Sequence, residues 1–138
     1  MKTLLLIRGL PGSGKTTLGA FLSSMAAGGY AVHFEADRYF ERCEGGVTRY
    51  DFDASKLRQA HEDCESKTAH ALASGVPFVI VSNTSTQDWE VERYQSIAST
   101  HGYRFVSVIA ENRHGGESVH DVPDETVERM RDRFDINL

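Results

Sequence analysis

The sequence predicts a single α/β domain, a three-layer αβα sandwich in which helices cover both faces of a parallel sheet of four to five strands. Three observations predict this fold class. Strand-like and helix-like segments alternate along the chain, an order typical of parallel sheets. The run Phe78-Val79-Ile80-Val81 is apolar throughout, as expected of a central strand. A glycine-rich segment, residues 9–14, separates the first strand-like segment from the first helix-like one.

The first half of the chain contains two predicted strands and one predicted helix. Residues 3–7, Thr-Leu-Leu-Leu-Ile, form a buried first strand. Residues 17–27 form a helix that Gly28-Gly29 closes, and residues 31–35 form the second strand. Gly45-Gly46 then marks a turn.

In the second half, two helices flank the central strand at residues 78–81. The first covers residues 55–73, is ended by Gly75, and has an apolar stripe that we expect to face inward: Leu57, Ala60, Cys64, Ala71 and Leu72. The second covers residues 89–99, with an expected inward face of Trp89, Tyr94, Ile97 and Ala98.

The chain closes with a strand, a polar loop and a last helix. Residues 103–109 form the fourth strand. Residues 111–122 contain Gly115-Gly116 and many polar groups, and we expect them to form a mobile lid near the C-terminus. Pro123 begins the last helix, whose apolar residues Val127, Met130 and Phe134 share one face.

Length and composition limit the possible functions. The 138 residues suit one domain, residues 1–138, and 40% hydrophobic with 25% charged residues is ordinary for a soluble globular protein. A net charge of −5 argues against sequence-independent binding of nucleic acid through a broad basic surface. Cys43 and Cys64 form no paired motif, so neither a disulfide nor a zinc site is expected. No apolar run suits a membrane span or a secretion signal, so we expect a cytoplasmic protein with no membrane partner. The sequence shows no clear apolar patch for a partner surface, so we expect no obligate protein partner.

The glycine-rich segment continues into a complete phosphate-binding motif, G-x-x-x-x-G-K-T, at residues 9–16. Its glycines let successive backbone N–H groups point at a polyphosphate, and the following helix adds its positive end. Lys15 is expected to reach the β- and γ-phosphates of ATP, and the Thr16 hydroxyl to bind Mg²⁺. The predicted nucleotide-binding set is Gly9, Pro11, Gly12, Ser13, Gly14, Lys15, Thr16 and Thr17.

Asp37 follows the second strand and is a candidate catalytic base. A carboxylate just past a strand end is placed to face the γ-phosphate and to take the proton of an acceptor hydroxyl. The alternative is that Asp37 caps the helical turn that follows it. If Asp37 acts as the base, Arg38 or Arg42 is the residue expected to hold a phosphate of the acceptor.

Two further candidate groups come from later segments. The central strand ends in Ser82, where a carboxylate for the Mg²⁺ shell is missing, and Asn83 and Thr84 either bind substrate or cap the next helix. An arginine in the lid would neutralise charge on the transferring phosphoryl group. Arg113 is the lid candidate, with the helical pair Arg129 and Arg133 as alternatives. It is equally consistent with the sequence that Arg113 is a solvent-exposed loop residue without a catalytic role.

The order of these motifs resembles the P-loop polynucleotide kinase family, which has a P-loop NTPase-type fold. The resemblance rests on residues 9–17, Ala36-Asp37, residues 81–84 and residues 122–130, and it covers essentially the whole chain. It implies that Lys15 and Thr16 bind ATP and Mg²⁺, that Asp37 is the general base, and that Arg113 is the lid arginine. A second alignment puts Glu117 where relatives carry that arginine, and Ser82-Asn83 departs from their usual aspartate.

The resemblance implies an ATP-dependent kinase whose acceptor is a nucleic-acid hydroxyl, with DNA favoured over RNA and bound locally. One acceptor is a polynucleotide 5′-hydroxyl. Another is the hydroxymethyl group of 5-hydroxymethyluracil, used by related phage enzymes of DNA modification, which would place the protein in the host cytoplasm. Two alternatives stay open: a kinase for a nucleoside, sugar or antibiotic, and a nucleotide-binding ATPase switch without an acceptor.

Overall fold

The centre of the protein is a parallel sheet of four strands in the order β2-β5-β1-β6. The computed structural model describes residues 1–26, 28 and 30–138. The strands of this sheet are β1 (Thr3–Arg8), β2 (Ala31–Phe34), β5 (Phe78–Ser82) and β6 (Arg104–Ile109). β5 and β1 occupy the centre, with Leu5 opposite Ile80. The predicted parallel sheet and the central position of the apolar strand are confirmed.

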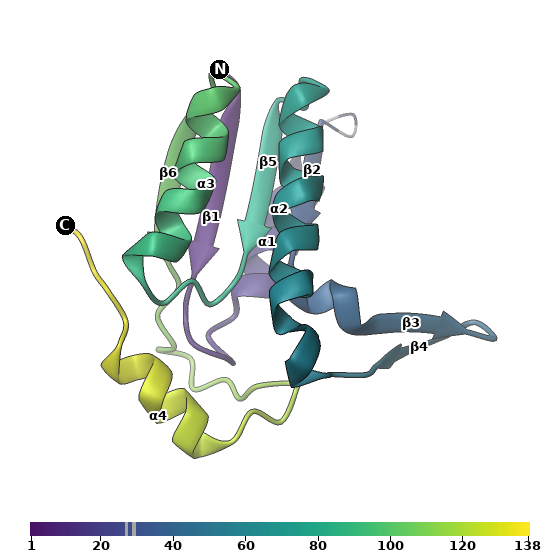
Figure 1. The fold of residues 1–138 in the computed structure, drawn as a ribbon, viewed down its shortest axis with the longest axis vertical. Coiled ribbons are helices and arrows are strands. Elements are labelled where there is room, and N and C mark those ends of the chain that lie inside the picture. The colour runs from purple at the N-terminus through teal and green to yellow at the C-terminus, as the bar shows by residue number, and fades with distance from the viewer. Residues whose placement is uncertain (27, 29) are drawn as a thin grey trace.

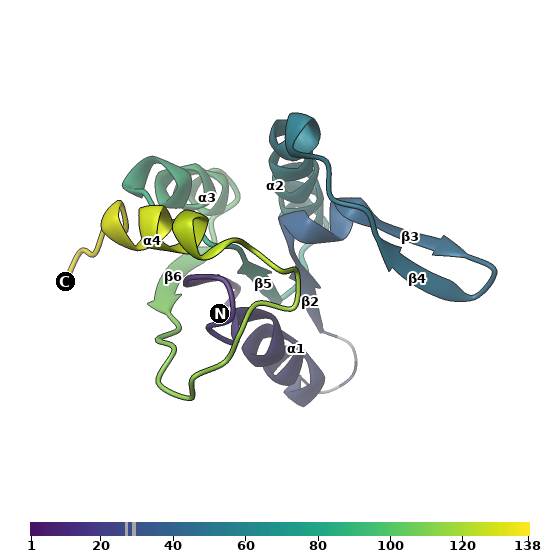
Figure 2. The same cartoon turned by 90° about the horizontal axis from the view of Figure 1, so that it is seen from below.

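Helices cover both faces of the sheet, as the three-layer prediction requires. Helix α1 (Lys15–Met25) lies on one face, and α2 (Leu57–Ala73) and α3 (Asp88–Thr100) lie together on the other (Figures 1 and 2). α1 begins two residues earlier than predicted, at Lys15. Its predicted end at Ala27 and the closing residue Gly29 lie outside the described residues.

Alternate side chains of the central strands fill two separate cores. Leu4 and Leu6 of β1 face α2 and α3, while Leu5 and Ile7 face α1. The larger core is completed by residues that the helical periodicity predicted correctly: Ala60, Cys64, Ala71, Leu72, Tyr94 and Ala98. Because both faces of the central strands are buried, their sequences are continuously apolar.

Two residues predicted to face inward are exposed instead. Leu57 is 42% exposed and Trp89 is 55% exposed. They lie in the first turns of α2 and α3, near the carboxyl ends of the strands, and the first turn of α2 extends past those ends (Figure 1). The apolar stripe of each helix therefore continues beyond the core.

A β-hairpin that the sequence analysis did not predict follows the second strand. It consists of β3 (Glu41–Glu44) and β4 (Val47–Tyr50), joined by Gly45 and Gly46 with φ of 57° and 81°. Two consecutive positive φ values match a tight hairpin turn, which explains the predicted glycine pair. The arms project away from the sheet and are mostly exposed, so they lack the apolar alternation by which strands are recognised (Figure 1).

The last helix, α4 (Asp124–Asp132), crosses below the carboxyl ends of the strands (Figures 1 and 2). A buried arginine at the end of β1 holds the tail that follows α4. Arg8 is 4% exposed, and its guanidinium donates to the carbonyls of Ser85 (2.8 Å) and Asp135 (2.9 Å). The same guanidinium lies 4.8 Å from the ring centre of Phe134.

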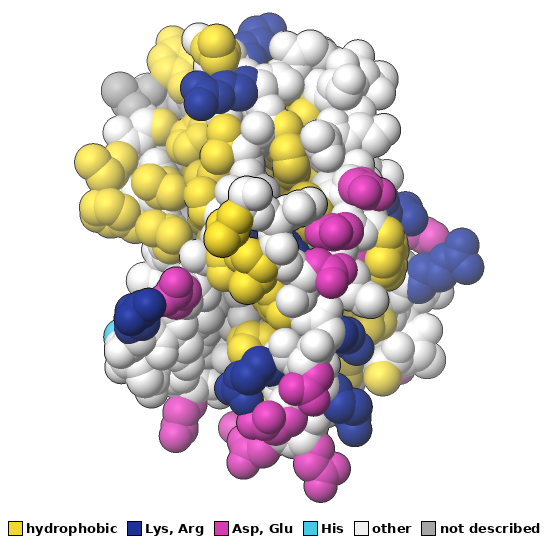
Figure 3. All heavy atoms as spheres, turned by 90° about the vertical axis from the view of Figure 1, so that its left-hand side faces the viewer, with side chains coloured by type: hydrophobic (Ala, Val, Ile, Leu, Met, Phe, Trp, Pro, Cys, Tyr) yellow, Lys and Arg dark blue, Asp and Glu magenta, His cyan; other side chains and the backbone are white. Residues whose placement is uncertain are grey.

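β6 leaves one edge of the sheet open, on the side shown in Figure 3. Hydrophobic side chains gather on the upper part of this face, and acidic and basic side chains lie together at its lower end, at the height of α4 (Figure 3). Within the described residues, no helix is both long enough and apolar enough to cross a membrane.

Candidate active site

The glycine-rich motif forms a loop between β1 and α1 that is shaped to hold phosphate. Gly12 and Gly14 have φ of 84° and 89°, a left-handed conformation that side chains disfavour. α1 begins directly after the loop, so its unpaired N–H groups face the same space. Ser13 is buried, and among the described residues its hydroxyl has no hydrogen-bond partner. Of the remaining predicted residues, Pro11 lies in the loop and Thr17 in the first turn of α1.

Lys15 lies inside this loop, where its ammonium group donates to the carbonyl of Leu10 at 2.9 Å. Burial lowers the pKa of Lys15 to about 8, and the carboxylates of Asp37 and Glu35 oppose this effect. A partly desolvated cation enclosed by backbone donors fits a polyphosphate. The carboxylates that act on Lys15 are the two that follow β2.

Glu35 is a site residue that the sequence analysis missed. Its carboxylate accepts a hydrogen bond from the Thr16 hydroxyl at 2.7 Å, and its side chain is only 9% exposed. The signal was present, because Glu35 directly follows β2 and precedes Asp37 by two residues. Hydroxyl and carboxylate oxygens suit Mg²⁺. Among the described residues, no group of three or more His, Cys, Asp or Glu side chains is arranged to hold a metal ion.

Arg38 and His33 hold Glu35 in place. Arg38 donates to the His33 carbonyl at 2.8 Å and contacts Glu35 Oε1 at 3.2 Å. Arg38 also contacts His33 Nδ1 at 3.2 Å. Because a guanidinium can only donate hydrogen bonds, Nδ1 must be the accepting nitrogen of the ring. His33 Nε2 therefore carries the proton and donates to Ser82 Oγ at 2.6 Å. Burial lowers the pKa of His33, which favours the neutral ring. The guanidinium predicted to bind acceptor phosphate is thus directed toward the end of β2.

Asp37 lies on the 3₁₀ helix η2 (Ala36–Phe40), and its carboxylate is half exposed. His120 Nε2 lies 3.8 Å from Asp37 Oδ2. Burial, together with the charge of Asp37, raises the pKa of Tyr50 to about 12. The rings of Tyr50 and His120 stack with centroids 3.9 Å apart. The hairpin and the C-terminal segment therefore meet at Asp37, a contact that no local sequence pattern indicates.

Asn83 and Thr84, predicted to contact substrate, lie between the phosphate loop and η2. Asn83 is 6% exposed, and its side-chain oxygen accepts from the backbone N–H of Ala36 at 2.9 Å. Its amide nitrogen faces Tyr94 Oη at 3.4 Å, so the side chain is directed inward. The carbonyl of Thr84 accepts from the N–H of Gly9 at 3.3 Å. These contacts set the position of Asp37 relative to the loop.

The segment predicted as a lid, residues 111–122, lies across the phosphate loop. A Cβ atom on Gly12 would come within 2.8 Å of the Gly116 carbonyl, and one on Gly14 would lie 3.4 Å from the His114 ring. The Asn112 side chain closes this segment by bonding to the N–H and carbonyl of Gly116, at 2.8 and 2.7 Å. In this arrangement His114, rather than an arginine, covers the loop.

The predicted lid arginine lies away from the loop. Arg113 is 86% exposed and pairs with Glu111. The two alternatives are held by neighbours: Arg129 donates to Thr126 Oγ1 at 3.2 Å, and Arg133 donates to a side chain of the β5–α3 connection at 3.1 Å. A catalytic role for Arg113 would require the segment to rearrange.

A phosphate loop between β1 and α1, with carboxylates after the neighbouring strand of a parallel sheet, defines a kinase-type P-loop domain. The chain belongs to the AAA domain family, whose model matches residues 4–136. This membership confirms the resemblance to P-loop kinases drawn from the sequence.

Similarity to a curated protein covers part of the chain. NEDD4-binding protein 2 of Homo sapiens is 35% identical over 101 residues, which is 73% of this chain and 5% of that protein. The chain therefore spans a small fraction of that relative's length.

Solved structures share the fold at low sequence identity. Kti12 of Chaetomium thermophilum, in complex with ADP-AlF3, has a TM-score of 0.65 at 17% identity, covering 96% of this chain and 80% of that one. A chain of the Pnkp1/Rnl/Hen1 RNA repair complex has a TM-score of 0.58 at 17% identity, covering 96% and 37%. The APS kinase CysC of Mycobacterium tuberculosis has a TM-score of 0.57 at 12% identity, covering 96% of each chain. The fold thus occurs both in an APS kinase and in a chain of an RNA repair complex.

Proposed function

We propose that this protein transfers the γ-phosphate of ATP to a hydroxyl group of a nucleic acid. The acceptor is either a polynucleotide 5′-hydroxyl or the hydroxymethyl group of 5-hydroxymethyluracil in DNA. The observation that carries the proposal is the placement of Asp37 at the same sheet edge as Lys15, near enough for its charge to act on the Lys15 pKa. In this proposal Lys15 supplies a cation for the phosphoryl donor and Asp37 supplies a base for the acceptor, and both act on one reacting group.

The phosphate loop and Lys15 bind the donor. Backbone N–H groups of the loop and the N-terminus of α1 orient the phosphates, and Lys15 neutralises charge on the β- and γ-phosphates. When bound, Mg²⁺ neutralises further phosphate charge, and Thr16 and Glu35 are the residues that would hold it or its water shell.

Asp37 acts on the acceptor. Its carboxylate accepts the proton of the acceptor hydroxyl while the hydroxyl oxygen forms a bond to the γ-phosphorus of ATP. At the same time, the bond between the γ-phosphorus and the oxygen that bridges it to the β-phosphate breaks. ADP leaves with the electrons of the broken bond. Tyr50 and His120 flank the carboxylate and orient it toward the acceptor.

Two observations support a nucleic-acid acceptor over a small molecule. Next to Asp37 lies a cluster of aromatic rings that reaches the surface, a feature of proteins that stack single-stranded bases. A structure with the same fold belongs to an RNA repair complex. A small-molecule kinase is the second candidate, because the fold also occurs in an APS kinase.

Transfer of labelled γ-phosphate to three acceptors tests the proposal. These are single-stranded 5′-hydroxyl oligonucleotides, end-blocked DNA containing 5-hydroxymethyluracil, and a panel of free nucleosides and sugars. Label on either nucleic acid supports the proposal and identifies the acceptor. Label on the panel alone makes the protein a small-molecule kinase, and free phosphate without labelled acceptor makes it an ATPase.

A further inference from the structure

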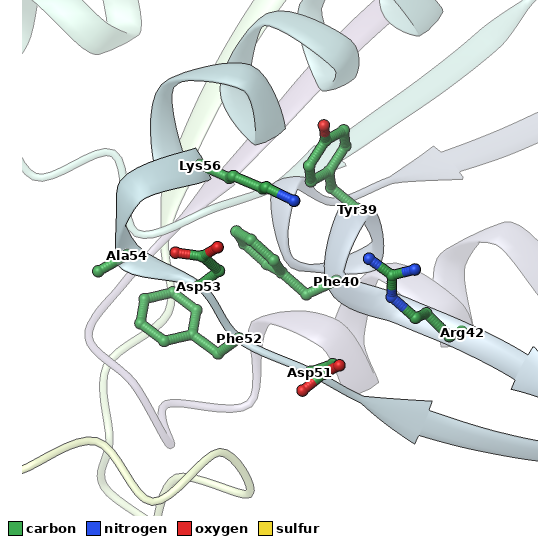
Figure 4. A pocket seen from close by; sticks show the side chains of 8 residues that line it. All are labelled: Tyr39, Phe40, Arg42, Asp51, Phe52, Asp53, Ala54 and Lys56. Atoms are coloured by element: carbon green, nitrogen blue, oxygen red, sulfur yellow. The ribbon is translucent and has the colours of Figure 1, made fainter.

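A cavity of about 540 Å³ opens on the side of η2 where the hairpin begins. Its wall comes from η2, from the start of β3, and from the segment that connects β4 to the 3₁₀ helix η3 (Ala54–Lys56) (Figure 4). This volume lies in the range that protein sites use for nucleotide-sized ligands. None of the candidate phosphate-loop residues contributes to the wall.

Aromatic rings form much of this wall. Phe40 is 3% exposed and packs edge-on against Tyr39 and Phe52, with ring centroids 5.5 and 5.1 Å apart. Tyr39 and Phe52 are themselves 40% and 53% exposed. Two exposed rings supported by a buried third ring form a rigid platform, and every nucleobase has a flat face that can stack on such a platform.

The platform is continuous with the proposed catalytic base. Tyr39 lies two residues after Asp37 on the same 3₁₀ helix. Phe52 stacks on Tyr50 with centroids 6.4 Å apart and an interplanar angle of 12°, and Tyr50 lies close enough to Asp37 for the charge of that carboxylate to help raise the Tyr50 pKa. A strand whose terminal hydroxyl lies at Asp37 would therefore pass its following nucleotide over these rings.

Two cations line the same cavity. In Figure 4 the amine of Lys56 points toward the space between Phe40 and Tyr39, and the guanidinium of Arg42 lies on the Tyr39 side. Within the part of the chain that the structure describes, neither cation forms an ion pair. Two carboxylates, those of Asp51 and Asp53, also belong to the wall, and Asp53 accepts hydrogen bonds from the N–H and hydroxyl of Ser55 at 3.0 and 2.6 Å. The cations are thus available to a phosphate.

We propose that this cavity is the binding site for the acceptor strand, in single-stranded form, beside its reacting hydroxyl. A base stacks on Tyr39 and Phe52, and Arg42 and Lys56 hold the adjoining phosphate. This inference rests on the proposed function and specifies which part of the molecule reads the acceptor. Of the two arginines predicted to hold the acceptor phosphate, it selects Arg42, because Arg38 is hydrogen-bonded to Glu35.

Equilibrium binding of a fluorescent single-stranded 5′-hydroxyl DNA 10-mer tests the site without requiring turnover. Phe52→Ala is expected to weaken binding about 5- to 150-fold, the effect of losing one base stack. Phe21→Ala is the matched control, because Phe21 is similarly exposed, at 58%, and lies on α1. Affinity for a non-hydrolysable ATP analogue should stay within about 2-fold of wild type in both variants, since neither ring belongs to the phosphate loop.

Arg42→Gln provides an independent test on a residue of the exposed hairpin. It is expected to lower the salt slope of DNA binding by about 0.7, the value for one lost phosphate contact to single-stranded DNA. Arg104→Gln, on the exposed start of β6, should leave the slope unchanged. If both cavity variants bind DNA as their controls do, the site is overturned even where wild-type protein labels DNA. If wild-type protein labels only small molecules and does not bind the 10-mer, both the site and the nucleic-acid function are overturned.

Discussion

Glu35 is the residue that most changes the sequence-based account of this site. The central strand ends in Ser82, at a position where P-loop kinases are expected to carry an acidic residue for the Mg²⁺ shell. The structure supplies an acidic oxygen from the neighbouring strand instead, hydrogen-bonded to Thr16 at 2.7 Å. The carboxylate missing after one strand is therefore present after the adjacent one.

We expect Glu35→Gln to raise the Mg²⁺ concentration needed for tight nucleotide binding by about 10-fold or more, because outer-shell partners of metal ligands have effects of this size. Calorimetric titration of ADP at several Mg²⁺ concentrations measures this directly. Glu44→Gln, at the exposed tip of the hairpin, is the control. An unchanged Mg²⁺ requirement in Glu35→Gln would remove this residue from the metal site.

Lys15 makes nucleotide binding depend on pH. Its pKa of about 8 means that the free protein loses the ammonium charge as the pH rises through that value. Bound phosphates favour the charged form, so binding takes up a proton and affinity falls above pH 8. Titrations at pH 8 in buffers of different ionisation enthalpy should show uptake of about half a proton by the protein. No uptake would mean that the Lys15 pKa lies well above 8.

Residue identities near the phosphates were predictable, and those around Asp37 were only partly so. Lys15 and Thr16 have fixed positions in a motif whose shape follows from its glycines. Tyr50 and His120 come from a hairpin and from an irregular segment, and they meet Asp37 through tertiary packing alone. No periodicity or residue spacing in the sequence predicts the contact of these two side chains with Asp37.

At the scale of elements, Arg8 links the end of β1 to the tail after α4. Its donors satisfy the carbonyls of Ser85 and Asp135, and burial lowers its pKa while the carboxylates of Asp88 and Asp135 oppose this. In the sequence, this arginine is recognisable only as the residue that ends an apolar run, so its anchoring contacts cannot be predicted. Its role depends on a contact with a residue 127 positions away.

Arg8→Met is expected to lower the free energy of unfolding by about 2 kcal/mol, because two hydrogen bonds from a charged, buried donor are lost. Urea denaturation measures the change, and amide exchange should become faster in α4 than in α2. Arg104→Met, which alters an exposed arginine, serves as the control. Equal unfolding free energies for Arg8→Met and wild type would contradict the anchoring role.

Elements with a buried face were predicted well, and elements without one were not. The strands of the sheet and helices α2 and α3 follow from apolar periodicity and from glycine or proline at their ends. β3 and β4 bury no apolar face, so only their glycine turn was visible. Leu57 and Trp89 show the opposite error, because the apolar periodicity predicts that both side chains are buried, whereas both are exposed.

At the scale of the whole molecule, the net charge of −5 limits how the protein holds an acceptor. Basic and acidic side chains are interspersed on the face in Figure 3 rather than separated into a basic patch. Attraction to nucleic acid must then come from a few local cations and from stacking.

The expected dependence of DNA binding on salt is therefore shallow. Two phosphate contacts predict a slope of about −1.4 in a plot of log affinity against log salt for single-stranded DNA. Titrations of the 10-mer between about 50 and 200 mM salt measure it. A slope several times steeper would indicate a broad electrostatic surface, which this distribution of charge does not provide.

Labelled γ-phosphate transfer by wild type and by Asp37→Asn, with ATP affinity measured on the same samples, tests whether Asp37 is the catalytic base. We predict that transfer to the preferred acceptor falls about 10²- to 10⁴-fold while ATP affinity stays within about 3-fold, because Asp37 acts on the acceptor's proton and the phosphate loop is untouched. Asp132→Asn, at the end of α4, should behave as wild type. Transfer that survives in Asp37→Asn would contradict the account, and the protein would then need another base or none.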